Sequence, residues 1–244
     1  MIIHTPAIVI RTIDYRESSK IVTLFTQTQG KVAVIVKGIK KSNSNFSGLL
    51  EIGNILDIVM YYKESRSVQN LTKASYKAKT YDIRVNLEKM AISTATLEMI
   101  DQLVMDNLEN EAFYKFTENF LIWLHETKHS PRKLFPYIQL RLAEIMGIAL
   151  CYESTDDSGT DNYLNIEEGI VSNHQSSGLS YKLTFGQVNY IKQGLGPQKG
   201  LVIKSDLSMQ EIKNLIYHLD VYMKHHIDGL KDRRSDKIFY QILN

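Results

Sequence analysis

The chain has 244 residues, of which 43% are hydrophobic and 23% charged, a composition typical of a folded globular protein. It contains no apolar run of about eighteen residues, which excludes a membrane-spanning helix. The single cysteine, Cys151, excludes an internal disulfide and agrees with a cytoplasmic protein. The first eighteen residues lack a basic lead and a small-residue cleavage site, so we interpret them as a strand and not as a signal peptide.

Charge is distributed unevenly along the chain. The first eighty residues carry 12 Lys and Arg against 5 Asp and Glu, a net charge of +7, whereas the whole chain has a net charge of only +2. Residues 81–168 reverse the balance, with 7 basic and 16 acidic residues. This segregation predicts a module that binds a polyanion, joined to a part that does not touch one.

Apolar and β-branched runs fill the basic segment and are interpreted as strands. They cover residues 5–13, 21–26, 31–36, 52–62 and 67–76. The second and third runs meet at residues 27–30, a hairpin turn with Gly30 in the tight position. Five short strands in about eighty residues predict a small closed barrel, because closure removes the exposed edges of the sheet.

After residue 80 the apolar residues recur at helical spacing. The pattern predicts helices across residues 83–104 and 113–124, and a third that opens at Pro131 and ends at Gly147. Residues 151–180 are polar and could form a short hairpin around Gly169. Two further helices are predicted by capping boxes, Thr184-x-x-Gln187 and Ser208-x-x-Glu211. A helical domain over residues 81–244 therefore follows a barrel domain over residues 1–80.

The loop at residues 37–45 is the strongest candidate binding site. It places the ammonium groups of Lys37, Lys40 and Lys41 within five residues, beside Gly38 and small polar residues. Each lysine could displace a counterion from a phosphate backbone. The alternative is a solvated loop whose charges only aid solubility. Other cations on neighbouring strands or turns could extend the patch: Arg11, Arg16, Lys20 and Lys31.

Aromatic side chains on such a barrel could stack on the bases of a single strand. The candidates are Tyr15, Phe25, Phe46, Tyr61, Tyr62 and Tyr76. Phe46 lies in the basic loop and is the best stacking candidate. Phe25, between two apolar strand positions, is interpreted as core.

His125-Glu126-Thr127-Lys128-His129 matches H-E-x-x-H, the pattern in which two histidines on one helix face bind zinc and the glutamate is a general base. The helix would have to continue through His129, but Pro131 disfavours helix for the residue before it, and Lys128 would place a cation beside the metal. A zinc hydrolase is therefore the weakest hypothesis. The alternative is a polar helix end at which a histidine complements the helix dipole.

Residues 151–175 hold Cys151 and His174 as potential ligands of a soft metal, two where a structural zinc site needs four. We therefore expect no zinc site, and the pattern leaves open whether these two residues bind any metal.

Residues 5–41 resemble the opening of the bacterial recombination mediator RecO family. The family has an initial strand, a Glu-Ser turn, a T-L-F-T-like strand, a glycine turn and a basic loop. The corresponding residues here are Arg11, Glu17-Ser18, Thr23 to Thr26, Gly30 and Lys37 to Lys41. The agreement continues more loosely through the helical and hairpin regions, so that it covers most of the chain.

The resemblance implies an α+β protein, with an N-terminal OB-fold barrel followed by a helical domain. Many members carry a zinc-binding insertion with two C-x-x-C pairs. Here Cys151 matches its first position, while Ser154, Ser172 and Gln175 stand near the others. We therefore expect a metal-free hairpin insertion at about residues 149–181, with no cofactor.

The resemblance also implies function without catalytic turnover. Members bind single- and double-stranded DNA, anneal complementary strands, and act with RecR to help RecA replace single-strand DNA-binding protein, whose acidic tail they bind. Such a protein of the RecFOR pathway would act at the nucleoid in the cytoplasm. The DNA-binding residues carried over are Lys37, Lys40 and Lys41, with Arg11 and Lys31 less securely. An RNA-binding OB-fold protein is the alternative.

Overall fold

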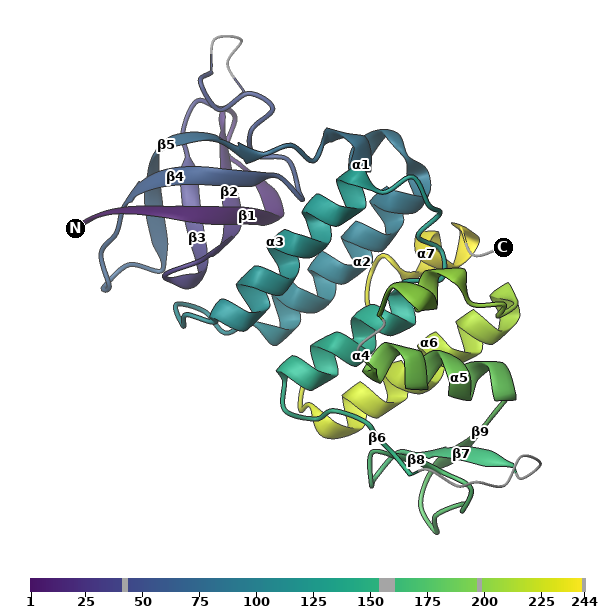
Figure 1. Ribbon diagram of the computed structural model, residues 1–244. Coiled ribbons are helices and arrows are strands. Elements are labelled where there is room, and N and C mark those ends of the chain that lie inside the picture. Colours follow the sequence, from purple (N-terminus) through teal and green to yellow (C-terminus); the bar gives the residue numbers. More distant parts are fainter. Residues whose placement is uncertain (41–43, 154–160, 197–198, 243–244) are drawn as a thin grey trace. The chain divides into compact units, whose positions relative to one another are not determined.

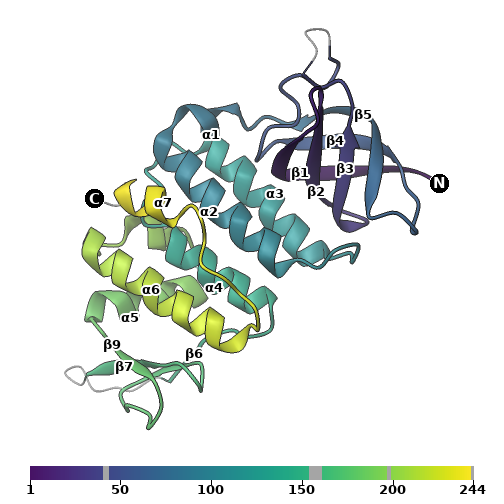
Figure 2. The same cartoon turned by 180° about the vertical axis from the view of Figure 1, so that it is seen from behind.

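The structure, a computed structural model, describes residues 1–40, 44–153, 161–196 and 199–242. The chain forms two compact units, Met1–Thr127 and Lys128–Asn244, which are described separately. Figure 1 labels the helices and strands, and Figure 2 gives the view from behind. Within the described residues, every helix is too short or too polar to cross a bilayer.

The basic segment folds into a closed barrel, as predicted. Its strands pair in the order β1-β2-β3-β5-β4, and β4 closes onto β1. All pairs are antiparallel except β3 with β5. This is the strand order of an OB-fold. The strands are β1 (Ile2–Tyr15), β2 (Ser19–Thr26), β3 (Gly30–Val36), β4 (Ile55–Tyr61) and β5 (Val68–Ala78).

The long first strand closes the barrel because it pairs with two partners. Its first half, from Ile2 to Ile8, pairs with β4, and its second half pairs with β2. A bulge between Val9 and Arg11 lets the strand bend from one partner to the other. The fourth strand begins at Ile55, three residues later than predicted, because Gly53 adopts a left-handed conformation (φ 86°) that turns the chain just before it.

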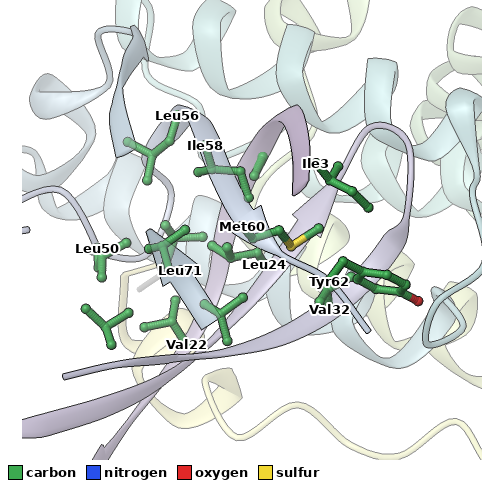
Figure 3. Close-up of a cluster of buried hydrophobic side chains, with 14 residues drawn as sticks. Ile3, Val22, Leu24, Val32, Leu50, Leu56, Ile58, Met60, Tyr62 and Leu71 are labelled. Carbon is green, nitrogen blue, oxygen red and sulfur yellow. The ribbon is translucent and has the colours of Figure 1, made fainter. Parts of the chain in front are cut away.

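Alternate residues of the strands fill the barrel interior, which Figure 3 shows in close-up. Val22, Leu24 and Val34 are fully buried there, while the residues between them face outward. Each such side chain contributes about 1.5–3 kcal/mol when removed from water. Burial alternates along β3 in the same way, with every second residue inside.

Three helices complete the first unit: α1 (Tyr81–Val85), α2 (Leu87–Leu103) and α3 (Glu111–Glu126). The side chains of Asn86 and Asn110 cap α2 and α3 by accepting backbone hydrogen bonds. The two helices lie side by side and antiparallel (Figure 1), since Lys89 near the start of α2 donates to the carbonyl of His125 near the end of α3, 2.9 Å away.

The helices cover one end of the barrel's outer surface. The ring of Tyr114 on α3 meets Phe25 edge to face, with centroids 5.6 Å apart. Gly30 begins β3 with φ 60° and lies directly against the backbone of Leu108, in the connection between α2 and α3. Lys77 on β5 forms an ion pair of 2.7 Å with Glu118 on α3. Phe25 is therefore core, as its sequence neighbours indicated.

The second unit combines helices with a small sheet of strand order β6-β8-β7-β9. Both predicted capping boxes are present, at Thr184 and Ser208. The helix expected to open at Pro131 begins instead at Phe135, because residues 131–134 form a turn in which Leu134 N–H donates to the Pro131 carbonyl. The elements of the second unit are α4 (Phe135–Ile145), β6 (Cys151–Tyr152), β7 (Asn162–Asn165), β8 (Ile170–Ser172), β9 (Ser180–Leu183), α5 (Phe185–Leu195), a 3-10 turn (Lys199–Lys204), α6 (Met209–His226) and α7 (Asp236–Ile242).

The predicted hairpin around Gly169 is confirmed by β7 and β8. Asn165 is the hydrogen-bonding centre of this sheet. Its buried amide donates to the Ser172 hydroxyl and the His174 carbonyl, and accepts from the Ser176 N–H and the Ser180 hydroxyl at 2.8–3.1 Å. The network satisfies every hydrogen-bonding position of one buried side chain, which fixes the loop between β8 and β9.

We predict that Gly30→Ala destabilises the first unit by about 3 kcal/mol or more. A Cβ atom there would lie 2.0 Å from the Leu108 carbonyl oxygen, in a conformation that already disfavours side chains. Urea unfolding measures the loss. Gly48→Ala is the matched control, because Gly48 has a similar φ of 73° but nothing closer than the Tyr76 hydroxyl at 3.8 Å. It should cost about 1 kcal/mol. Equal losses would contradict the close approach at Gly30.

We also predict acid sensitivity from His218 on α6. Its ring stacks on Tyr181, with centroids 4.2 Å apart and Tyr217 beside them, and burial lowers the pKa of His218 to about 4. The unfolded chain takes up this proton below about pH 6.5, and the folded chain only near pH 4, so stability falls as the pH drops through that window.

Partial solvent exposure reduces the effect to about 1 kcal/mol. His218→Phe keeps a stacked ring without the proton. The difference in unfolding free energy between pH 7 and pH 4.5 should therefore be smaller in the variant than in the original chain. An equal difference would show that His218 is not responsible.

Candidate nucleic-acid interface

An apolar row lies on the outer face of β1, β2 and β3. Strand register aligns Ile13 with Ile21, and Ile21 with Ile35. These side chains point away from the core, because their neighbours Val22 and Val34 point into it. Ile13 is 52% exposed, which is unusual for an isoleucine in the middle of a sheet. This is the face on which OB-folds hold oligonucleotides.

Cations lie at the edge of this row, where β1 turns into β2 and β3 ends. Arg16, in the turn, has φ 55°, and its guanidinium lies over the Tyr15 ring at 5.2 Å from the centroid. Lys37, directly after β3, is exposed. Neither Arg16 nor Lys37 forms an ion pair with any residue that the structure describes. They are therefore available to an anion.

Two further cations lie near one carboxylate where β1 turns into β2, and one of them, Lys40, forms an ion pair with it. Lys20 on β2 lies directly opposite Asp14 on β1, and on the same side as the core residue Val36. Lys40 lies 3.1 Å from Asp14, and its backbone N–H donates to the Ser18 carbonyl. The basic loop is thus tied to the β1–β2 turn. Lys41, the third lysine of the predicted loop site, lies outside the described residues.

Asp101, near the end of α2, lies on the side of the row opposite Arg16 and Lys37. Its carboxylate lies 3.7 Å from Arg11 and 3.5 Å from Lys31. Lys31 is only 16% exposed, donates to the Asp101 carbonyl at 2.6 Å and also pairs with Asp106 at 3.3 Å. The surroundings of Lys31 therefore support a structural role and not the predicted DNA contact. Arg11 remains at the edge of the open face.

Phe46, the predicted stacking residue, is half-buried and packs against the barrel core. Only part of its ring is available to a base. Tyr15, next to Arg16 on the apolar face, is better placed for that role. The sequence ranked Phe46 above Tyr15 because Phe46 lies in the basic loop, and it gave no sign that the ring packs against the barrel core.

The H-E-x-x-H pattern does not form a zinc site. Helix α3 ends at Glu126, so His129 lies beyond it and the helical spacing of the two histidines is lost. His125 instead lies 3.7 Å from Asp82 and packs against the Tyr81 ring. Among the residues that the structure describes, no three His, Cys, Asp or Glu side chains gather as metal ligands would.

The positions that carry cysteines in the resembling family do not suit zinc here. Cys151 is exposed at the edge of the small sheet, and Gln175 is also exposed. Ser172 is buried, with its hydroxyl bonded to Asn165 and to the His174 carbonyl. Hydroxyl and amide groups replace the thiolates that a structural zinc requires. Ser154 lies outside the described residues.

Sequence reasoning missed the apolar row and Asp101. A signal for the row was present in the sequence. Each of Ile13, Ile21 and Ile35 directly precedes a residue that points inward, and successive side chains of a strand point to opposite faces. Asp101 gave no signal, because its partners Arg11 and Lys31 lie far away in the chain and only the fold brings the three together.

We predict that Lys31→Met lowers stability by about 1–2 kcal/mol, because it leaves Asp101 without its nearest cation. The same change should leave the salt dependence of DNA binding as it was. Lys37→Met is the control, with the opposite pattern expected. Thermal unfolding and fluorescence anisotropy measure the two effects. A stable Lys31→Met variant with a weaker salt dependence would assign Lys31 to DNA after all.

Two known protein families match the chain. Residues 1–79 match the family described as Recombination protein O N terminal, and residues 84–236 match the one described as Recombination protein O C terminal. The two matches together span the barrel, helices α2 to α6 and the small sheet.

Curated relatives match the chain over 60–100% of its length. The DNA repair protein RecO of Chloroherpeton thalassium is 29% identical over 258 aligned residues that cover 100% of both proteins. That of Salinibacter ruber is 32% identical over 69% of this chain and 66% of its own length, and that of Chlorobium limicola is 33% identical over 60% and 56%. The chain therefore belongs to the recombination protein O family.

Proposed function

We propose that this chain is a non-enzymatic, DNA-binding mediator of recombinational repair. Its family membership supports a role in DNA repair and recombination. The observation that carries the DNA-binding part is the open face of β1, β2 and β3. There, the exposed apolar row around Ile13 lies between Arg11 at one end and Arg16 and Lys37 at the other.

This arrangement suits a nucleic-acid strand in two ways. The apolar row offers a surface on which unstacked bases can pack, with the Tyr15 ring beside it. The cations at its edges can meet phosphates on either side. Aliphatic side chains have no donors or acceptors, and cations that contact phosphates do not read the bases, so we expect binding without sequence preference.

Strand annealing is part of the proposal. Two phosphate backbones repel each other unless cations lie between them, and a basic surface at the end of a barrel lowers that repulsion. We propose that Lys20, Lys37 and Lys40, with Lys41 in the same loop, serve this purpose. The same surface would bind duplex DNA, whose charge density is higher.

The proposed partners follow from the family. With RecR, the protein would help RecA to replace single-strand DNA-binding protein, and would bind that protein's C-terminal tail. We propose no catalytic residue and no cofactor. The work would be done by binding energy at the nucleoid.

We predict that the double change Arg16→Gln and Lys37→Gln weakens binding to single-stranded DNA. The slope of log K against log salt should become shallower by about 0.7 for each cation removed. Fluorescence anisotropy with a labelled oligothymidylate, at several salt concentrations, measures it. A matched RNA competitor tests the RNA-binding alternative, which would be favoured if RNA displaced the oligonucleotide more effectively than DNA.

Lys204→Gln with Lys237→Gln is the matched control. Both lysines are exposed in the second unit, and the pair removes the same total charge. If this control weakens binding as much as the barrel variant does, the site on the barrel is wrong.

A further inference from the structure

Asp14 lies beside cations of the proposed surface where β1 turns into β2. Strand register places it directly opposite Lys20, and its carboxylate lies 3.1 Å from Lys40. The side chain of Asp14 is 67% exposed and that of Lys40 is 36% exposed. The pair is therefore open to solvent, and an incoming phosphate could displace the carboxylate.

Asp101 makes a parallel arrangement at the other edge of the apolar row, beside Arg11 at 3.7 Å. This carboxylate is only 20% exposed and is held by Lys31. It is therefore a fixed neighbour of Arg11. At the β1–β2 turn next to the face and at the edge of the face near Arg11, one cation of the proposed surface already has a carboxylate of the same chain beside it.

Such pairing changes the thermodynamics of DNA binding. A free cation that neutralises a phosphate releases a counterion from DNA, which gives binding its favourable salt-dependent term. A cation that is taken from a carboxylate contributes a smaller salt-dependent term, because the displaced carboxylate then recruits a cation from solution. An exposed ion pair is worth only about 0–1 kcal/mol, so the exchange remains feasible.

We infer that Asp14 is an internal counter-ion of the DNA-binding surface, which holds Lys40 in place of a phosphate and keeps DNA binding weak and quickly reversible. The inference rests on the proposed function and adds to it a residue that opposes binding. A protein that hands a strand to a partner needs such a limit, because affinity changes are expressed mostly in the dissociation rate.

The test is Asp14→Asn, which keeps the size of the side chain and removes its charge. Binding of a labelled oligothymidylate should tighten, and the slope of log K against log salt should steepen by about 0.7. Between about 50 and 200 mM salt, the variant should therefore lose about 2.5-fold more affinity than the original chain. Its dissociation rate at low salt should fall in parallel.

Glu17→Gln is the matched control. Glu17 lies three residues from Asp14, is exposed, and makes no ion pair with a residue in the described part of the chain. Its removal changes net charge by the same amount, so a smaller gain than that of Asp14→Asn separates pairing from net charge. Equal gains in the two variants would overturn the inference.

A double change locates the effect at Lys40. In a Lys40→Gln background, Asp14→Asn should bring at most half of its original gain in affinity, because the paired cation is gone. An undiminished gain would refute the pairing. If the original chain binds the oligonucleotide with a slope that Arg16→Gln and Lys37→Gln reduce, but Asp14→Asn changes nothing, only this inference fails. If the chain does not bind it at all, both proposals fail.

Discussion

The contacts of the Lys31 ammonium group determine which part of the barrel's outer face the helices leave uncovered. The ammonium group joins the start of β3 to the end of α2 through Asp101, and to the next connection through Asp106. Gly30 beside it admits the backbone of Leu108, which a side chain would exclude. The helices therefore cover the outer face around Phe25 and stop at Arg11. What remains open on β1, β2 and β3 is the apolar row around Ile13, with its edge of cations.

The net charge of the barrel overestimates how many of its cations could contact DNA phosphates. Lys31 and Lys77 are paired with acidic residues of the helices, Arg11 lies beside Asp101, and Lys40 lies beside Asp14. The segregation of basic and acidic residues along the sequence thus has two causes. Part of it provides a surface for a polyanion, and part of it joins the barrel to the acidic helices within one compact unit.

Sequence reasoning succeeded where the signal was local. Five short apolar and β-branched runs predicted the barrel, and the capping boxes at Thr184 and Ser208 placed two helix starts. It failed where partners lie far apart in the chain or where elements are very short. The pairing of Lys31 with Asp101 spans seventy residues, and β6, with two residues, is too short to show a period. The sequence ranked Lys31 below Lys37 as a DNA-binding residue, but it gave no sign that Lys31 is paired with Asp101.

Paired cations also bear on the product of annealing. Duplex DNA gives a salt slope of about 0.9 per neutralised phosphate, against about 0.7 for a single strand, so each unpaired cation holds the product more strongly than the substrate. A surface made only of free cations would therefore retain the duplex that it had helped to form. In the annealing that we propose, a carboxylate such as Asp14, which lies 3.1 Å from Lys40, would offset part of this preference. Weak binding at this surface would then allow the protein to release the annealed duplex and bind further strands.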